Sequence, residues 1–360
     1  AALVAAFLSV LPAMYKHYDA PRNLRPAHGA LKRLCELFVK EFTSLADIPI
    51  SKALCSVFTL YRQSAEEITT SSHAGPDRHA VKTDCVMLLR RLLGMCLNSR
   101  GDPLNNKRHC MVPIATQLLR LYLCNGQHFL GQKLLREMGG VINFRTQLSE
   151  YPTSIATEFA FYLGKLAVLS EKFNDAQFYL MFSYRACLSY PNQKAVAGNM
   201  QRILRMLVPV QMLLGVPPAD QLLAQRRLPE YRTMVNAIHN GKLGQFRQCL
   251  LLNQRRYAAW GVYFALEKLE VVLLRNLFRL VFTIHGTTRI PLSCFEKALK
   301  ISSGPRVDAF HSNNAACILS NLIELGMVRG YVSHGHQMVV LSAKAPFPAL
   351  QPLLKKCSIR

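Results

Sequence analysis

The chain has 360 residues, of which half are hydrophobic and 18% are charged. This composition is too apolar for a disordered protein and indicates globular domains with large buried cores. The 44 Lys and Arg exceed the 21 Asp and Glu, which gives a formal net charge of +23. Because so large an excess repels itself, we expect the protein to have an anionic partner.

The N-terminal segment AALVAAFLSVLPAMY carries no charge. It is too short to span a bilayer and lacks the basic start of a signal peptide. We therefore expect a buried helix here and no membrane insertion.

Cysteine spacing bears on the redox environment. The closest two of the eleven cysteines, Cys85 and Cys96, are well separated, and no CxxC pair occurs. This spacing favours reduced thiols in an intracellular protein over a disulfide framework.

Helical periodicity dominates the first two thirds of the chain. CVMLLRRLLGMCL and IATQLLRLYL place apolar residues three and four positions apart, as helices with one buried face require. Gly-, Pro- and Asn-containing stretches at 71–79 and 98–107 predict loops between such helices.

A degenerate repeat indicates stacked helix pairs. Residues 159–188 predict two antiparallel helices, in which Gly164 permits close contact, Phe173 follows the turn and Ala176 packs between the helices. These offsets are tetratricopeptide-like, although Glu171 stands where the usual glycine precedes the turn. A weaker echo contains Leu119, Gly126 and Phe129, and residues 238–250 predict a further turn. We expect an irregular helical solenoid, which leaves an extended surface for partners.

The pattern changes after about residue 256. Apolar helices lead into a short extended piece, TTRIPL, followed by the helix LSCFEKALKI and a third helix over 312–325. The third helix has an apolar stripe, and Gly326 is suited to end it in a left-handed conformation.

Two apolar β-type runs, MVRGYVS and QMVVLS, flank the sequence HGHQ. His334 and His336 suggest either a metal site or the turn of a hairpin. Zinc needs three or four ligands, and no Cys or carboxylate lies nearby in the sequence to complete the set. We therefore predict a turn and no metal. Three helices and a hairpin make a winged helix.

The predicted fold class is mainly α: a tetratricopeptide-like helical-repeat solenoid capped by a C-terminal winged helix. The predicted domains are a solenoid over 1–255, a winged helix over 256–345 and a tail over 346–360.

Four motifs carry a resemblance to a known family: LVPVQMLLG, ALEKLEVVLLRNLFRLVF, CILSNLIELGMVRGYVSHGHQMVV and PFPAL. Together they resemble the PCI-domain subunit of the TREX-type transcription-and-export complex, most strongly over 200–350. The resemblance implies a PCI domain in a non-catalytic subunit at the nuclear pore, in the nucleus, that couples transcription to mRNA export. It also implies three partners: a large export scaffold protein with its own winged helix, a small acidic disordered subunit, and RNA or DNA.

The charge map supplies candidate residues for the acidic partner. Residues 200–255 carry eight basic and two acidic groups, which is the densest basic excess in the chain. A solvated helix face would give the same pattern, so both interpretations remain open. The candidates for binding the acidic partner are Arg202, Arg205, Arg226, Arg227, Lys242 and Arg247.

The candidates for nucleic acid lie in the predicted winged helix, where cations would bind phosphate in a salt-dependent manner. They are alternatively ordinary surface cations, and Arg275 alternatively packs or pairs within the fold near Glu267 or Glu270. The third helix carries no Lys or Arg, so we expect weak sequence preference. The candidate residues are Arg275, Arg279, Lys297, Lys300, Arg306, Arg329 and Lys344. Tyr331 and Phe347 offer possible stacking surfaces, with core packing as the alternative.

An enzyme is disfavoured, since GxSxG, HExxH and GxxxxGK[ST] motifs are missing from the sequence. We expect no catalytic residue and no cofactor. The alternative function is a structural subunit of a related PCI assembly, signalosome-like, proteasome-lid-like or splicing-associated, whose winged helix makes only protein contacts.

Overall fold

A computed structural model describes residues 25–42, 48–70, 78–99, 107–304 and 314–350. The predicted N-terminal helix and most of the two predicted loops lie outside these residues. The chain divides into two compact units, residues 1–162 and 163–360. The domain boundary predicted at 255/256 falls within the second unit and stays a prediction.

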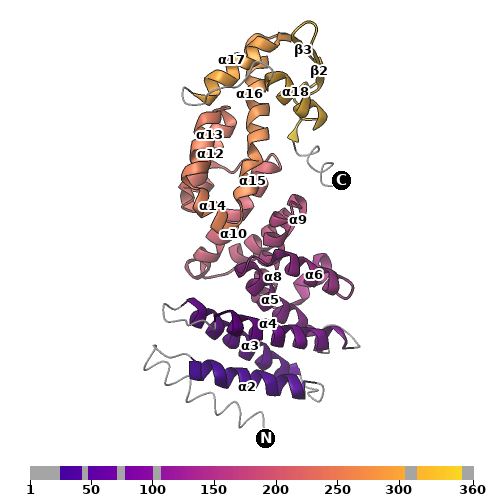
Figure 1. The fold of residues 1–360 in the computed structure, drawn as a ribbon, viewed down its shortest axis with the longest axis vertical. Coiled ribbons are helices and arrows are strands. Elements are labelled where there is room, and N and C mark those ends of the chain that lie inside the picture. The colour runs from indigo at the N-terminus through magenta and orange to yellow at the C-terminus, as the bar shows by residue number, and fades with distance from the viewer. Residues whose placement is uncertain (1–24, 43–47, 71–77, 100–106, 305–313, 351–360) are drawn as a thin grey trace. The chain divides into compact units, whose positions relative to one another are not determined.

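The first unit consists of helices (Figure 1). In order they are α2 (Arg25–Glu41), α3 (Ile48–Thr70), α4 (Arg78–Leu97), η1 (Lys107–Cys110), α5 (Met111–Cys124), α6 (His128–Gly139), α7 (Phe144–Gln147), η2 (Leu148–Glu150) and the first part of α8 (Thr153–Leu169). From α2 to α6, each α-helix packs against the next in the chain. Gly126, with φ of 71°, turns the chain between α5 and α6, as the repeat pattern predicts.

The second unit continues with helices and ends in a small sheet (Figure 1). Its helices after α8 are α9 (Phe173–Leu188), α10 (Gln193–Leu213), α11 (Asp220–Gln225), α12 (Pro229–His239), α13 (Leu243–Leu252), α14 (Gln254–Trp260), α15 (Tyr263–Glu267), α16 (Leu269–His285), α17 (Leu292–Ser303) and α18 (Asn314–Glu324). Its strands are β1 (Arg289–Pro291), β2 (Gly330–Ser333) and β3 (Met338–Leu341).

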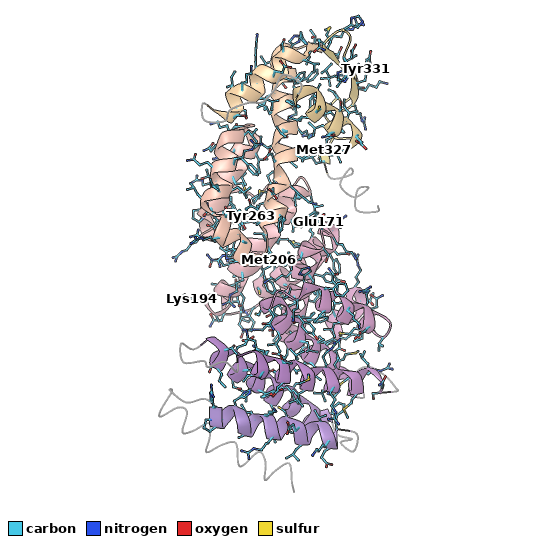
Figure 2. The ribbon with its side chains drawn as sticks, in the orientation of Figure 1. Glu171, Lys194, Met206, Tyr263, Met327 and Tyr331 are labelled. Atoms are coloured by element: carbon cyan, nitrogen blue, oxygen red, sulfur yellow. The ribbon has the colours of Figure 1, made fainter. Side chains whose placement is uncertain are left out.

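The helix pair predicted over 159–188 is confirmed. A Cβ atom at Gly164 on α8 would lie 2.6 Å from Cγ of Leu180 on α9, so only glycine allows this approach. Ala176 is fully buried. Glu171 adopts the left-handed conformation, with φ of 59°, that a glycine takes in the usual motif (Figure 2). The sequence departs from the tetratricopeptide pattern at this position, whereas the backbone keeps it.

Helices α16, α17 and α18 enclose the core of the winged helix. Phe278 and Phe295 meet edge to face, with ring centroids 5.1 Å apart. Leu319 and Val339 are fully buried in the same cluster. Gly326, with φ of 70°, follows α18 as predicted. The predicted fold class, helical repeats followed by a winged helix, is therefore confirmed.

The three strands form an antiparallel sheet in the order β1-β3-β2. His334 and His336 are exposed in the turn between β2 and β3, where the backbone N–H of Gln337 donates to the carbonyl of His334. The turn interpretation is correct. Among the described residues, no group of three or more His, Cys, Asp or Glu is placed to hold a metal ion.

The first unit buries a charged network. The Arg62 side chain is 2% exposed, pairs with Glu66 at 2.5 Å and donates through Nε to Gln117. Glu66 also accepts from Arg120 at 3.1 Å. Such a network offsets the desolvation of Arg62, since an unpaired charge buried this deeply is strongly destabilising.

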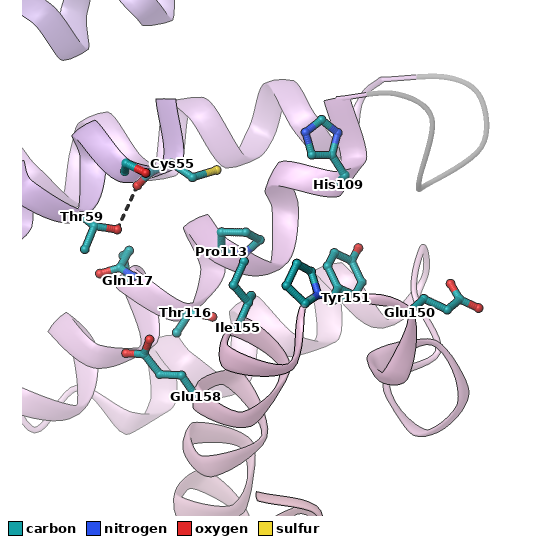
Figure 3. Close-up of a pocket in the computed structure, with 12 residues that line it drawn as sticks. Cys55, Thr59, His109, Pro113, Thr116, Gln117, Glu150, Tyr151, Ile155 and Glu158 are labelled. Carbon is teal, nitrogen blue, oxygen red and sulfur yellow. Dashed lines mark hydrogen bonds between the residues drawn. The ribbon is translucent and has the colours of Figure 1, made fainter. Parts of the chain in front are cut away.

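A cavity of about 640 Å³ lies beside this network (Figure 3). Gln117 from α5 and Glu158 from α8 line it, with Cys55 from α3 on another wall. Burial raises the pKa of Glu158, against the lowering effect of Arg120 and Arg62. The hydroxyl of Tyr151, which also lines the cavity, has no hydrogen-bond partner.

We predict that Gly244→Ala destabilises the second unit by about 1–3 kcal/mol, because a Cβ atom there would lie 2.5 Å from the Ser303 carbonyl oxygen, a backbone atom of α17. Gly198→Ala is the matched control, since it is helical with no neighbouring atom within 4 Å, and it should stabilise by about 1 kcal/mol. Urea unfolding of both variants tests this. Equal effects of the two substitutions would contradict the close approach of α13 and α17.

We predict that Glu158→Gln stabilises the protein increasingly as pH rises. A carboxyl whose folded pKa is raised binds more protons in the folded state, so its contribution to stability falls as pH rises from 4.5 through the folded pKa. The amide of the variant does not titrate, so the variant does not lose stability in this way as pH rises. Melting temperatures of both proteins from about pH 4 to 8 check this. Glu150→Gln, on the exposed rim of the cavity, is the control for removing one carboxylate. A difference in melting temperature that stays constant across the pH range would refute the raised pKa of Glu158.

Candidate functional site

The outer face of the small sheet carries a cationic and aromatic surface. Arg289 on β1 and Tyr331 on β2 both pair with Val340 on β3, so the three side chains share one face. The opposite face, with Val339 and Leu341, is buried in the core. Tyr331 is 61% exposed and Arg289 is exposed as well. Figure 2 labels Tyr331. An aromatic ring with a guanidinium across the sheet suits a stacked base and its phosphate.

Arg329 and Lys344 lie at the end of this face. The Arg329 N–H donates to Pro346 O at 2.8 Å, and its carbonyl accepts from Ser342 N at 2.9 Å, so the strand pattern of β2 extends back to Arg329. By alternation Arg329 then shares the outer face with Tyr331. The exposed Lys344 donates through its backbone N–H to Ser342 Oγ at 3.3 Å. We call Arg289, Arg329, Tyr331 and Lys344 the sheet surface.

The remaining winged-helix candidates lie elsewhere. Lys297 and Lys300 are exposed on α17. Arg306 lies outside the described residues. The exposed positions of α18 include Ser320, Asn321 and Glu324. Among the described residues, the exposed positive charge of the winged helix is therefore on the sheet, α16 and α17, and not on α18.

Arg275 does not reach the surface. It is 5% exposed, donates to Pro348 O at 2.6 Å and to Asn276 Oδ1 at 3.0 Å, and lies 5.9 Å from the centroid of the Phe347 ring. Its hydrogen bonds are thus with a carbonyl and an amide. Arg275 therefore packs within the fold, in agreement with the alternative interpretation, but its hydrogen-bond partners do not include Glu267 or Glu270. Arg279, one turn further, is exposed. Phe347 packs against the winged-helix core.

Four of the six acidic-partner candidates come together where α10 passes the turn before α12. Gln201 Nε2 donates to Arg227 O at 3.2 Å, and the Tyr231 hydroxyl donates to Arg205 O at 2.6 Å. Arg202 and Arg227 are exposed and Arg226 is half-buried. The Arg205 guanidinium lies 4.5 Å from the centroid of Trp260, which holds it in place. We call Arg202, Arg205, Arg226 and Arg227 the arginine cluster.

Lys242 and Arg247 lie on the α13 side of the second unit. Arg247 forms a bidentate ion pair with Glu270 on α16, at 2.6 and 3.2 Å. Its charge is therefore compensated within the fold, whereas Lys242 is exposed.

A groove of about 1160 Å³ lies between α13, α16 and α17. Its most exposed large side chains are aliphatic: Leu251 at 70%, Leu252 at 76%, Ile284 at 86% and Ile301 at 83%. So many exposed aliphatic side chains around one groove mark a protein-interaction surface. We call this the apolar groove.

Sequence reasoning missed Arg289 and the apolar groove. The pairing register that places Arg289 and Tyr331 on either side of Val340, on one face of the sheet, is not readable from separate short runs. Leu251 and Leu252 follow a helical apolar pattern, and the sequence alone does not distinguish an exposed pair from a buried one.

Burial shifts three cysteines of the described residues away from nucleophilic chemistry. Burial raises the pKa of Cys85 to about 12, and also raises the pKa of Cys187 and Cys249. A catalytic thiol needs a lowered pKa. No helix of the described residues is long and apolar enough to cross a membrane.

Comparison with known proteins agrees with this architecture. Residues 246–343 match the model of the PCI domain. PCI domain-containing protein 2 of Danio rerio is 27% identical over 355 residues, covering 98% of this chain and 85% of that protein.

Two further relatives come from distant organisms. A PCI domain-containing protein 2 homolog of Dictyostelium discoideum is 29% identical over 340 residues, covering 93% of this chain and 75% of the relative. A CSN12 homolog of Schizosaccharomyces pombe is 31% identical over 265 residues, covering 72% of this chain and 60% of the relative. The matched residues include the winged helix, so the chain carries a PCI domain there, and over most of its length it is similar to PCI domain-containing protein 2 homologs.

Proposed function

We propose that the chain is a non-catalytic scaffold and nucleic-acid-binding subunit of a nuclear complex that couples transcription to mRNA export at the nuclear pore. The family assignment supports membership of a protein complex, and the motifs over 200–350 support the export complex among PCI assemblies. The exposed cations of the second unit support an anionic ligand.

The sheet surface is the observation that carries nucleic-acid binding. Arg289 and Arg329 share the outer face of the sheet with the exposed ring of Tyr331, and the exposed Lys344 follows β3. Phosphates would bind the cations through counterion release, and a base would stack on the ring. Because no Lys or Arg lies on α18, base-edge recognition is weak and single-stranded RNA or DNA is the expected ligand.

Two protein partners fit two further surfaces. The arginine cluster suits a small acidic disordered subunit. The apolar groove suits a largely apolar segment of a large scaffold protein that carries its own winged helix, because its exposed side chains are mainly aliphatic. Of the two cations that line the groove, Arg247 is paired with Glu270 and Lys242 is exposed. Surfaces of different chemistry allow both partners to bind at once.

The second candidate function is a structural subunit of a signalosome-like assembly that makes only protein contacts. The apolar groove favours this second function, because a subunit that makes only protein contacts needs a protein-binding surface and no nucleic-acid site.

We predict that Arg289→Glu/Arg329→Glu weakens binding of a 20-nucleotide poly(U) RNA at least about tenfold and lowers the salt slope by about 0.7 for each lost phosphate contact. Tyr331→Ala should weaken binding by about 1–3 kcal/mol with the slope unchanged, because it removes a stacking surface. Fluorescence anisotropy across a salt series measures both.

Arg255→Glu/Arg256→Glu on α14 is the matched control, because it makes the same charge change at two exposed positions. Equal losses in the two double variants would mean that only net charge matters, and the sheet surface would then not be the binding site.

We predict that Ile284→Glu/Ile301→Glu abolishes capture of the scaffold partner, while Arg226→Glu/Arg227→Glu abolishes capture of the acidic subunit. Each change places charge on one surface only, and both pairs include exposed positions that tolerate substitution. Affinity purification of the tagged chain, with identification of partners by mass spectrometry, measures this.

Phe264→Glu, at a 72% exposed position outside the groove, is the control for adding charge at an apolar site. Recovery of signalosome subunits in place of an export scaffold would select the second function. Retention of both partners by both variants would remove the surface assignments.

A further inference from the structure

A second cavity, of about 440 Å³, lies in the second unit between α10, α12, α16 and residues 349–350. Its volume falls in the range of small-molecule sites, roughly 300–1,000 Å³. Most of its wall is apolar and includes Met212, Val235, Ile238, Val272 and Leu350.

The polar part of the wall has one sign of charge. Arg275 and Arg279 from α16 line the cavity together with His239 and Asn276, and no Asp or Glu is among its lining residues. The two arginines are one helical turn apart, so their guanidinium groups face the same side of α16.

Arg275 is a buried cation without an anion. Its side chain is 5% exposed, its two Nη atoms donate to neutral oxygens of Pro348 and Asn276, and its Nε has no partner. Burial, and next the positive charge of Arg279, lowers its pKa, with no acidic group contributing. A charge buried in this way is destabilising unless an opposite charge compensates it.

We propose that this cavity binds a small organic anion, with a carboxylate or phosphate at Arg279 and close to Arg275, and a short apolar body against Val235, Val272 and Leu350. The anion compensates the charge of Arg275, and the body fills the apolar part of the wall. Neither the nucleic-acid surface nor the protein-partner surfaces include this cavity, so the proposal does not depend on them.

The test uses the full chain with sodium hexanoate as probe, against acetate for the charge alone and hexanol for the chain alone. Calorimetric titration and thermal shift should give saturable binding of hexanoate and a rise in melting temperature that acetate and hexanol do not produce at the same concentration. Hexyl phosphate should bind in the same way.

Three variants separate the site from its surroundings. Arg279→Met should weaken hexanoate binding at least about tenfold, since it removes a charge-assisted contact at an exposed position. Val235→Phe should also abolish binding, because it fills the cavity and leaves both arginines in place. Arg289→Met is the matched control, which loses nucleic-acid affinity and keeps hexanoate affinity.

A capped Leu-Glu-Leu peptide tells the two sources of the carboxylate apart. Tighter binding of the peptide than of hexanoate would assign the cavity to a partner's side chain, and weaker binding would assign it to a free anion. If acetate raises the melting temperature as much as hexanoate does, and Arg279→Met changes neither rise, then only a general salt effect is present and the site is refuted. The effect of Arg289→Met on nucleic-acid binding is measured in a separate experiment. Failure of the nucleic-acid assignment therefore does not refute the anion cavity, and failure of the anion cavity does not refute the nucleic-acid assignment.

Discussion

The packing of α16 against the winged-helix core constrains the rest of the second unit. Phe278 is fully buried against Phe295. Since a helix repeats every 3.6 residues, fixing that one face sets the direction of every other α16 side chain. Arg275 then lines the 440 Å³ cavity, Ile284 borders the apolar groove, and Glu270 reaches Arg247 on α13. A single helix thus links the core to a cavity, a groove and an ion pair.

Local features of the fold were predictable because they depend on short-range chemistry. The turn at 334–337, the left-handed Gly326 and the glycine contact at Gly164 each follow from a few adjacent residues. Glu171 was harder, since a non-glycine residue there contradicts the repeat pattern while the backbone still adopts φ of 59°. Neighbouring helices impose that conformation, at a local cost of roughly 1–3 kcal/mol that tertiary packing offsets.

The candidate sites were less predictable because charge alone does not reveal burial. Arg275 and Arg279 look equivalent in the sequence, yet one is 5% exposed beneath residues 346–350 and the other is at the surface. The segment that covers Arg275 lies 73 positions away along the chain. Strand register, which places Arg289 and Tyr331 on the same face with Val340 between them, is likewise set by long-range pairing. Sequence patterns therefore identified the cations of the winged helix but not the way the fold divides them among surfaces.

Under the proposed function, the distribution of positive charge would let this winged helix bind nucleic acid without reading its sequence. In winged helices that read bases, side chains of the third helix reach into the major groove, whereas α18 offers only uncharged polar groups and Glu324. Cations on the sheet and on α17 would attract the phosphates of a nucleic-acid strand of any sequence, and a tyrosine ring stacks with any base. Selectivity would then come from the proteins that position this surface, and the apolar groove, 1160 Å³ in volume, is where such a protein can dock. A scaffold-type subunit needs this division, because its partners decide where it binds and its own surface supplies only the affinity.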